Sequence, residues 1–435
     1  MYKEILSRLQ IEKLNEMQEA TIQATKKSKD ILLLSPTGSG KTLAFLLPVL
    51  SQLKKDIVGV QTLILVPSRE LAIQIESVFK KMSTGFKVSC CYGGHATKVE
   101  KNNLEQQPAL LIGTPGRIAY HTRHNNYYAE TIKTLVLDEF DKSLEFGFEK
   151  DMSYIIYQLS KLDKRILTSA TAMDEIPAFT GVEDAFEINY LTAKENKPQL
   201  TLKAVRAFEN DKLDALFGLI CMLGDSTSLV FCNHREAVDR ISELLKKNGI
   251  IHDIYHGGME QEDRERALIK FRNGSHRILL TTDLASRGLD IPEIENVIHY
   301  QLPLNEDAYT HRNGRTARMK AEGNAWLVLA EEEQLPAFIK TKPEFEKLPT
   351  TPKMPPASEY VTIYLSAGKK DKVNKVDIVG FLLQKGKLQK EELGLIEVLD
   401  FTAYAAVKRN KVDELLYHIS KEKLKNKKVK IEISR

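Results

Sequence analysis

A glycine-rich stretch near the N-terminus has the residue types and spacing that bind phosphate. It follows an apolar run and opens a helical pattern. Its glycines let the backbone turn so that N–H groups face phosphate oxygens, and the helix start adds its positive dipole end. Lys41 is expected to reach the β- and γ-phosphates, and the Thr42 hydroxyl to ligate Mg²⁺. The alternative is a plain glycine-rich turn, because the general pattern starts with glycine where this stretch starts with serine. The stretch reads Ser35, Pro36, Thr37, Gly38, Ser39, Gly40, Lys41, Thr42.

Two carboxylates follow a second apolar run. The run 134–137 is succeeded by Asp138 and Glu139. A carboxylate at such a strand end can bind Mg²⁺ through its water shell, and its neighbour can orient or deprotonate an attacking water. We assign the first role to Asp138 and the second to Glu139. An acidic pair after a strand is most often a solvated turn, but the phosphate loop upstream favours the catalytic interpretation.

Short apolar runs alternate with helical patterns in two series that must position these groups. The runs are continuous and rich in β-branched residues, which is typical of strands buried on both faces of a parallel sheet. We therefore expect an α/β protein with two doubly wound domains. The expected strands are 31–34, 62–66, 109–112, 134–137 and 165–167, then 228–231, 250–255, 278–281, 297–300 and 325–329.

A proline-rich stretch, 348–357, precedes a smaller C-terminal unit and reads as an extended linker. The unit shows the pattern strand, helix, strand, strand, helix, strand, which is similar to the ferredoxin-like plan of RNA-recognition modules. From Ser358 to Arg435 there are 17 Lys and Arg against 11 Asp and Glu, so a polyanion could bind there. Its expected elements are 360–365, 375–383, 395–399, 402–407, 412–420 and 429–433.

Length and composition exclude several classes of protein. A chain of 435 residues exceeds one hydrophobic core, so two or three domains are expected. No apolar run approaches the roughly 20 residues that span a bilayer, and the N-terminal segment has no signal core. The cysteines show no CxxC spacing, which argues against a zinc site or a disulfide framework and for a reducing, cytoplasmic setting. They are Cys90, Cys91, Cys221 and Cys232.

Further motifs follow in a fixed order, and up to the proline-rich stretch the chain resembles the DEAD-box ATP-dependent RNA helicases. Residues 138–141 read Asp-Glu-Phe-Asp where that family has Asp-Glu-Ala-Asp. The resemblance implies two tandem RecA-like domains, RNA-dependent ATPase and helicase activity, ATP and Mg²⁺ as cofactors, and RNA as partner of a monomer. Phe140 is expected to pack beneath the site, and hydrolysis to survive this replacement.

The resemblance also assigns roles residue by residue. Gln18 would read adenine, although the usual Pro-Thr before it is absent, and Asp283 would lie near the ribose and phosphates. Arg315 and Arg318 would be arginine fingers that meet the γ-phosphate when the domains close; alone, their spacing indicates a solvated basic face. The residues expected to couple nucleotide to closure are Asp141, Ser169, Ala170, Thr171, His311 and Arg312. Contacts with the RNA backbone would be independent of its sequence and sensitive to salt. The residues expected to form them are Arg69, Gly93, Gly94, Thr114, Arg117, Thr282 and Arg287.

The C-terminal unit resembles the RNA-binding domain of DbpA-like helicases, which implies a ribosomal RNA hairpin of the large subunit as its target. Lys408, Arg409 and the run 421–430 are candidate RNA contacts. Possible stacking platforms are Tyr360, Tyr364, Phe401 and Tyr404, although such aromatic residues are more often part of a core.

The alternatives to an RNA helicase with an RNA-binding tail are an ATP-gated RNA clamp with little unwinding, a DNA translocase, and a tail that docks proteins. The expected domains are 1–197, 198–345 and 358–435, with a linker at 346–357.

Overall fold

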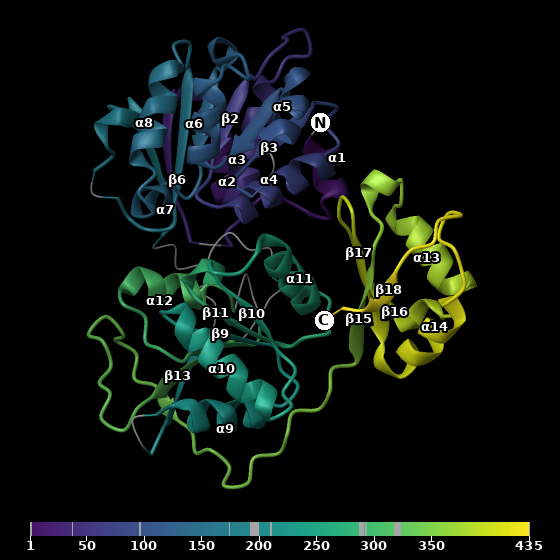
Figure 1. Ribbon diagram of the computed structural model, residues 1–435. Coiled ribbons are helices and arrows are strands. Elements are labelled where there is room, and N and C mark those ends of the chain that lie inside the picture. Colours follow the sequence, from purple (N-terminus) through teal and green to yellow (C-terminus); the bar gives the residue numbers. More distant parts are fainter. Residues whose placement is uncertain are drawn as a thin grey trace. The chain divides into compact units, whose positions relative to one another are not determined.

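The computed structural model describes residues 2–434 apart from 37, 95–96, 174, 192–199, 209–210, 287–290, 292–293 and 317–322. The chain divides into two compact units, which meet in sequence between residues 197 and 198. The first unit contains a seven-stranded sheet, and the second contains a seven-stranded and a four-stranded sheet (Figure 1). No described helix is both long and apolar enough to cross a membrane.

The sheet of the first unit is parallel in every described pairing, with the order β3-β4-β2-β5-β6-β1-β7. Successive residues of β1 enter different cores: Ile31 and Leu33 pack with α1 to α4, whereas Leu32 and Leu34 pack with α6 and α8. Helices therefore cover both faces. The strands are β1 (Asp30–Leu34), β2 (Thr62–Leu65), β3 (Val88–Cys91), β4 (Leu110–Gly113), β5 (Thr134–Leu137), β6 (Lys164–Ser169) and β7 (Phe186–Asn189). The helices are α1 (Tyr2–Arg8), α2 (Glu16–Lys27), α3 (Lys41–Gln52), α4 (Arg69–Lys81), α5 (Thr97–Glu105), α6 (Pro115–Arg123), α7 (Phe140–Glu145) and α8 (Glu149–Gln158).

The first sheet of the second unit repeats this plan, with parallel strands in the order β10-β11-β9-β12-β13-β8-β14. Val230 of β9 packs with α9 and α10, while Ala204 and Leu327 belong to a core on the other face. The strands are β8 (Leu200–Arg206), β9 (Ser228–Phe231), β10 (Asp253–Tyr255), β11 (Ile278–Thr281), β12 (Asn296–His299), β13 (Gly323–Leu329) and β14 (Glu344–Phe345). The helices are α9 (Leu213–Leu223), α10 (Arg235–Lys247), α11 (Gln261–Arg272) and α12 (Glu306–Asn313).

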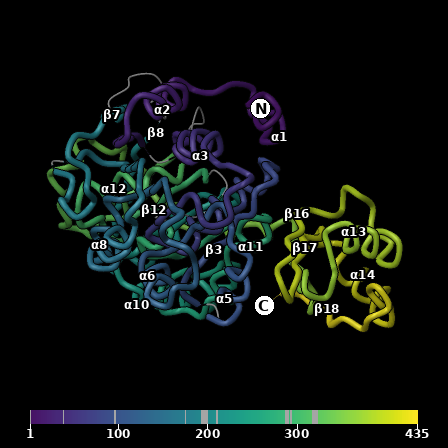
Figure 2. The backbone as a smooth tube through the Cα atoms, turned by 90° about the horizontal axis from the view of Figure 1, so that it is seen from above, coloured from purple at the N-terminus to yellow at the C-terminus, as the bar shows by residue number. Residues whose placement is uncertain are grey.

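The C-terminal elements form an antiparallel sheet with the order β16-β17-β15-β18. Both of its helices lie on one face of the sheet (Figures 1 and 2), where Ile363, Leu382 and Leu415 are fully buried. This order confirms the predicted βαββαβ plan, and the three sheets confirm the predicted fold class. The elements are β15 (Tyr360–Leu365), α13 (Lys375–Gln384), β16 (Leu393–Val398), β17 (Ala403–Lys408), α14 (Val412–Ile419) and β18 (Ile431–Ile433).

Candidate nucleotide and RNA sites

The phosphate loop connects β1 to α3 at the carboxyl edge of the first sheet. Its backbone is anchored where Ser35 N donates to Ser169 O of β6 at 3.0 Å. Gly40 ends the loop with a φ of +90°, in the left-handed region that favours glycine. The buried Lys41 amine donates to Ser35 O at 2.5 Å and to Pro36 O at 3.1 Å, so the loop curls around its own lysine. Thr37 lies outside the described residues.

Helix α2 and its N-cap residue form hydrogen bonds with the same loop. Asn15 caps this helix, and its Nδ2 donates to Ser39 O at 2.9 Å. The Gln18 side chain accepts from Asn15 N at 3.0 Å and donates to Gly40 O at 3.2 Å. A Cβ at Gly40 would lie 2.5 Å from Gln18 Nε2, so any larger residue at this position would displace the Gln18 amide. Gln18 is thus placed against the phosphate loop, and its contact with adenine stays a prediction.

The acidic residues follow β5, which is separated from β1 only by β6. Asp138 is buried, and its Oδ1 accepts from the Thr168 hydroxyl at 2.5 Å. The same hydroxyl accepts from Glu139 N at 3.2 Å. Thr168 was not predicted as a site residue, because the expected strand 165–167 ended one residue before it, whereas β6 continues to Ser169. Glu139 has a φ of +49°, and a left-handed conformation of a non-glycine residue is typical of functional sites.

Charges compensate one another in this buried site. Burial raises the pKa of Asp138, while the Thr168 hydrogen bond and the nearby Lys41 charge oppose that rise. Burial likewise lowers the pKa of Lys41, and the negative charges of Glu139, Asp138 and Asp141 oppose it. A bound cation near the carboxylates would favour their ionised form. The site therefore suits a ligand that brings both negative phosphates and a divalent cation.

The predicted coupling motif of the first unit contacts the last acidic residue of the Asp-Glu-Phe-Asp motif. The Thr171 hydroxyl donates to Asp141 Oδ2 at 3.1 Å. The Ser169 hydroxyl donates to Thr171 O at 2.7 Å and accepts from Thr171 N at 3.1 Å. The loop after β6 is thereby bonded to the acidic motif, and its role in coupling nucleotide to closure stays a prediction. Phe140 is fully buried with its ring centroid 6.2 Å from that of Phe179, which confirms that it packs beneath the site.

In the second unit, Arg312 binds Asp283 directly. Its Nε and Nη2 lie 2.6 Å and 2.9 Å from the two carboxylate oxygens. Two residues to which the sequence gave no individual role complete its surroundings: Asn233 Oδ1 accepts at 2.7 Å and Gln301 O at 2.8 Å. The fully buried arginine thus fixes the carboxylate expected near the ribose. His311 and Arg315 are buried too, whereas Arg287 and Arg318 lie outside the described residues.

Asn313, for which the sequence offered no role, accepts a hydrogen bond from His299 in this core. His299 Nε2 lies 2.9 Å from Asn313 Oδ1. Burial and the nearby Arg312 charge lower the pKa of His299 to about 3, while the bond to Asn313 opposes the shift. The imidazole therefore stays neutral at physiological pH, and α12 gains a fixed contact with β12.

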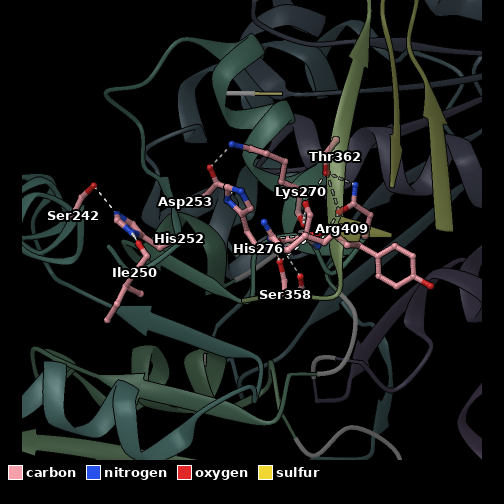
Figure 3. A network of polar contacts seen from close by, with 12 residues as sticks. Ser242, Ile250, His252, Asp253, Lys270, His276, Ser358, Thr362 and Arg409 are labelled. Carbon is pink, nitrogen blue, oxygen red and sulfur yellow. Dashed lines mark hydrogen bonds and ion pairs between the residues drawn. The ribbon is translucent and has the colours of Figure 1, made fainter. Parts of the chain in front are cut away.

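The C-terminal domain is tied to the turn after α11 (Figure 3). The Ser358 hydroxyl donates to Ser275 O at 2.5 Å, and Asn273 Nδ2 donates to the Thr362 hydroxyl at 2.8 Å. Arg409, a candidate RNA contact, donates from Nε to Ser358 O at 2.7 Å. Its guanidinium thus helps to fix the start of the domain. Lys408, the other candidate, pairs with Glu359 at 2.9 Å.

Three family models match successive parts of the chain. They describe a DEAD/DEAH box helicase at residues 15–179, a helicase conserved C-terminal domain at 211–320 and a DbpA RNA binding domain at 362–433. The ATP-dependent RNA helicase DbpA of Escherichia coli is 29% identical over 99% of this chain and 98% of its own. The ATP-dependent RNA helicase FAL1 of Mycosarcoma maydis is 34% identical over 72% of this chain and 80% of its own.

Solved structures agree with this assignment. Dbp5 of S. cerevisiae, bound to RNA and ADP BeF3, matches 76% of this chain and 88% of its own, with a TM-score of 0.67 and 27% identity. Mss116p, bound to ssRNA and AMP-PNP, matches 79% of this chain and 76% of its own, with a TM-score of 0.69 and 25% identity. The chain therefore belongs to the DEAD-box ATP-dependent RNA helicases, whose ATPase depends on RNA, and it carries a C-terminal RNA-binding domain of the DbpA type.

Proposed function

We propose that this helicase remodels structured ribosomal RNA during assembly of the large ribosomal subunit, and that its C-terminal domain selects the target. The observation that carries the proposal is the match of residues 362–433 to the DbpA RNA binding domain. The surplus of basic residues in this domain also supports the proposal, because a positively charged domain attracts a polyanion such as RNA.

A lysine-rich surface on this domain is the proposed RNA contact. Lys425 donates to Lys372 O at 2.8 Å, and Lys427 pairs with Asp371 at 3.3 Å. These contacts bring the segments 369–375 and 421–430 to one surface. Phosphates are free to compete for lysines that have no acidic partner. Within the described part of the chain, the exposed lysines of these segments whose side chains form no ion pair are Lys369, Lys370, Lys372, Lys375, Lys421, Lys423 and Lys428.

We assign a role to each residue of the proposed nucleotide site. Lys41 binds the β- and γ-phosphates, and Glu139 orients the attacking water. Mg²⁺ would be held by the Thr42 hydroxyl and the Asp138 carboxylate, hard oxygen donors that suit this ion and would supply charge neutralisation at the phosphates. Arg315 and Arg318 stabilise negative charge on the γ-phosphate during transfer. ATP binding and hydrolysis then switch the enzyme between states of higher and lower affinity for RNA. This change of affinity displaces one strand of an RNA duplex locally.

Crosslinking of the full chain to RNA in cells, followed by sequencing of the bound fragments, tests the target. We expect fragments of one structured region of large-subunit ribosomal RNA. The variant with Lys370→Glu and Lys428→Glu should lose that enrichment, while Lys353→Glu with Lys390→Glu, the same change of charge at other exposed lysines, should keep it. Equal enrichment in the two variants would refute the surface. Bound RNA without any ribosomal enrichment would refute the target.

A further inference from the structure

Glu100 of α5 is a buried carboxylate that accepts two hydrogen bonds and pairs with an arginine, and none of the recognised motifs includes it. Its side chain is 4% exposed. Oε1 accepts from Tyr92 N at 2.9 Å. Oε2 accepts from His121 Nε2 at 2.9 Å and lies 3.4 Å from Arg117 Nε. A charge is rarely buried without a specific partner, so this arrangement points to a defined role.

Glu100 contacts two of the stretches expected to bind the RNA backbone, and the Tyr92 ring connects them to the stretch that contains Arg69. Tyr92 directly precedes the glycine pair 93–94, and Arg117 belongs to the stretch 114–117. The guanidinium carbon of Arg69 lies 4.7 Å from the centroid of the Tyr92 ring. Gly94 has a φ of +94°, and a Cβ there would lie 3.1 Å from Arg69 Nη1. One buried carboxylate thus links the backbone before the glycine pair to Arg117.

His121 places a proton on the side that faces Glu100. Asn126 Nδ2 donates to His121 Nδ1 at 2.9 Å, so the neutral ring carries its hydrogen at Nε2. That hydrogen points to Glu100 Oε2, and the ring is fully buried. Glu100 therefore accepts a hydrogen bond from His121 and forms an ion pair with Arg117.

The same region includes Cys91, and the ligand atoms of Cys91, Glu100 and His121 lie within 4.8 Å of one another. That spacing would suit a metal ion, but the ring hydrogen at Nε2 occupies the lone pair that a metal needs. Arg117 already supplies a positive charge to the carboxylate. Burial, with the Glu100 charge adding to it, raises the pKa of the Cys91 thiol and so disfavours the thiolate that soft metals require. The geometry favours a hydrogen-bonded carboxylate.

We propose that Glu100 is a positioning residue for RNA binding, which fixes the Arg117 guanidinium and the backbone at Tyr92 in the orientation that meets the RNA phosphates. The inference rests on the RNA-backbone contact that the family resemblance implies for Arg117. An arginine that is held at Nε by a buried carboxylate loses less conformational freedom when it binds a phosphate. Glu100 acts through these groups and does not touch RNA itself.

Glu100→Gln tests the proposal, because an amide of the same shape has a single accepting oxygen and no charge to pair with Arg117. The RNA concentration that gives half-maximal ATPase stimulation should rise about tenfold, as expected when a charged hydrogen bond is lost. The fold-rise in the RNA requirement should exceed any fold-change in the ATPase rate at saturating RNA. The ATP concentration that gives half of the maximal rate should stay unchanged. Glu105→Gln, an exposed carboxylate on the same helix, should behave as wild type. An unchanged RNA requirement in Glu100→Gln would overturn the proposal.

A double-variant cycle separates this inference from the RNA contact on which it rests. Arg117→Ala should raise the RNA requirement, and adding Glu100→Gln should raise it little further. Additive effects would overturn the positioning role, whereas an inert Arg117→Ala would refute the RNA contact itself. If Glu100→Gln does not fold, Asn126→Ala at the edge of the network should raise the RNA requirement a few-fold, and no rise would count against the proposal. A stoichiometric metal ion in the purified wild-type protein would also overturn it.

Discussion

Replacing Lys41 by alanine is expected to reduce RNA-stimulated ATP turnover by at least about 100-fold, the scale of losing a charged group at the reacting phosphates. The lysine amine is enclosed by the loop through Ser35 O and Pro36 O, within reach of the phosphates that this loop would cradle. Its removal takes away the positive charge that opposes the effect of burial at Asp138, whereas Asp141 keeps the charge of Lys142. Release of phosphate, measured with saturating RNA and ATP, checks this expectation.

The control for this variant is Lys55→Ala, which removes an exposed lysine shortly after α3. It should turn over ATP at the wild-type rate. Thermal unfolding of both variants shows whether the fold is kept. If Lys41→Ala is folded and hydrolyses ATP as fast as Lys55→Ala, the phosphate loop is not the hydrolytic site.

Glu139→Gln is expected to lower ATP turnover about 100- to 10,000-fold, the range over which a positioned general base contributes. The change keeps the shape of the side chain but removes its charge, and Lys41 and Thr42 remain available for the phosphates and Mg²⁺. ATP affinity should therefore persist. The variant should accumulate with ATP and RNA bound, so RNA should dissociate more slowly in ATP than in ADP. Single-turnover hydrolysis and RNA dissociation measure the two effects.

Glu149→Gln provides the matched control, because Glu149 is an exposed carboxylate at the start of α8. It should match wild type in hydrolysis and in RNA release. Wild-type turnover in Glu139→Gln would contradict the assignment of Glu139 to the attacking water. A joint loss of turnover and of ATP binding would instead indicate that Glu139 supports the nucleotide pocket.

Most inner strands of both parallel sheets could be predicted because their apolar runs are buried on both faces. An inner strand of the second sheet, β8, was not predicted, and its burial alternates along its length. The edge strands of the first sheet could not be predicted either. Residues 88–91 read Val-Ser-Cys-Cys, and residues 186–189 are mostly exposed, so neither forms a continuous apolar run. The strand expected at 250–255 begins only at Asp253. His252 Nδ1 bonds to Ile250 O at 2.8 Å, which uses a carbonyl group that a strand would pair with its neighbour.

The motif residues of the candidate site were predictable, but the partners that orient them were not. Thr168 and Asn15 act through contacts across the fold, at Asp138 and Ser39 respectively. Such contacts depend on which elements become neighbours in space, and spacing along the chain does not contain that information. Glu100 is the extreme case, because an isolated glutamate on a short polar helix looks like a solvated residue until its burial is known.

Strand displacement by the full chain tests the central claim, that ATP hydrolysis drives the remodelling of an RNA that the C-terminal domain selects. Two substrates share one short duplex, and only one of them carries a structured fragment of large-subunit ribosomal RNA. The account predicts displacement that requires ATP, is faster on the substrate with the fragment, and loses this advantage with Lys370→Glu and Lys428→Glu. RNA-stimulated hydrolysis with no displacement would contradict the account and favour an ATP-gated clamp, and equal displacement of both substrates would contradict selection by this domain.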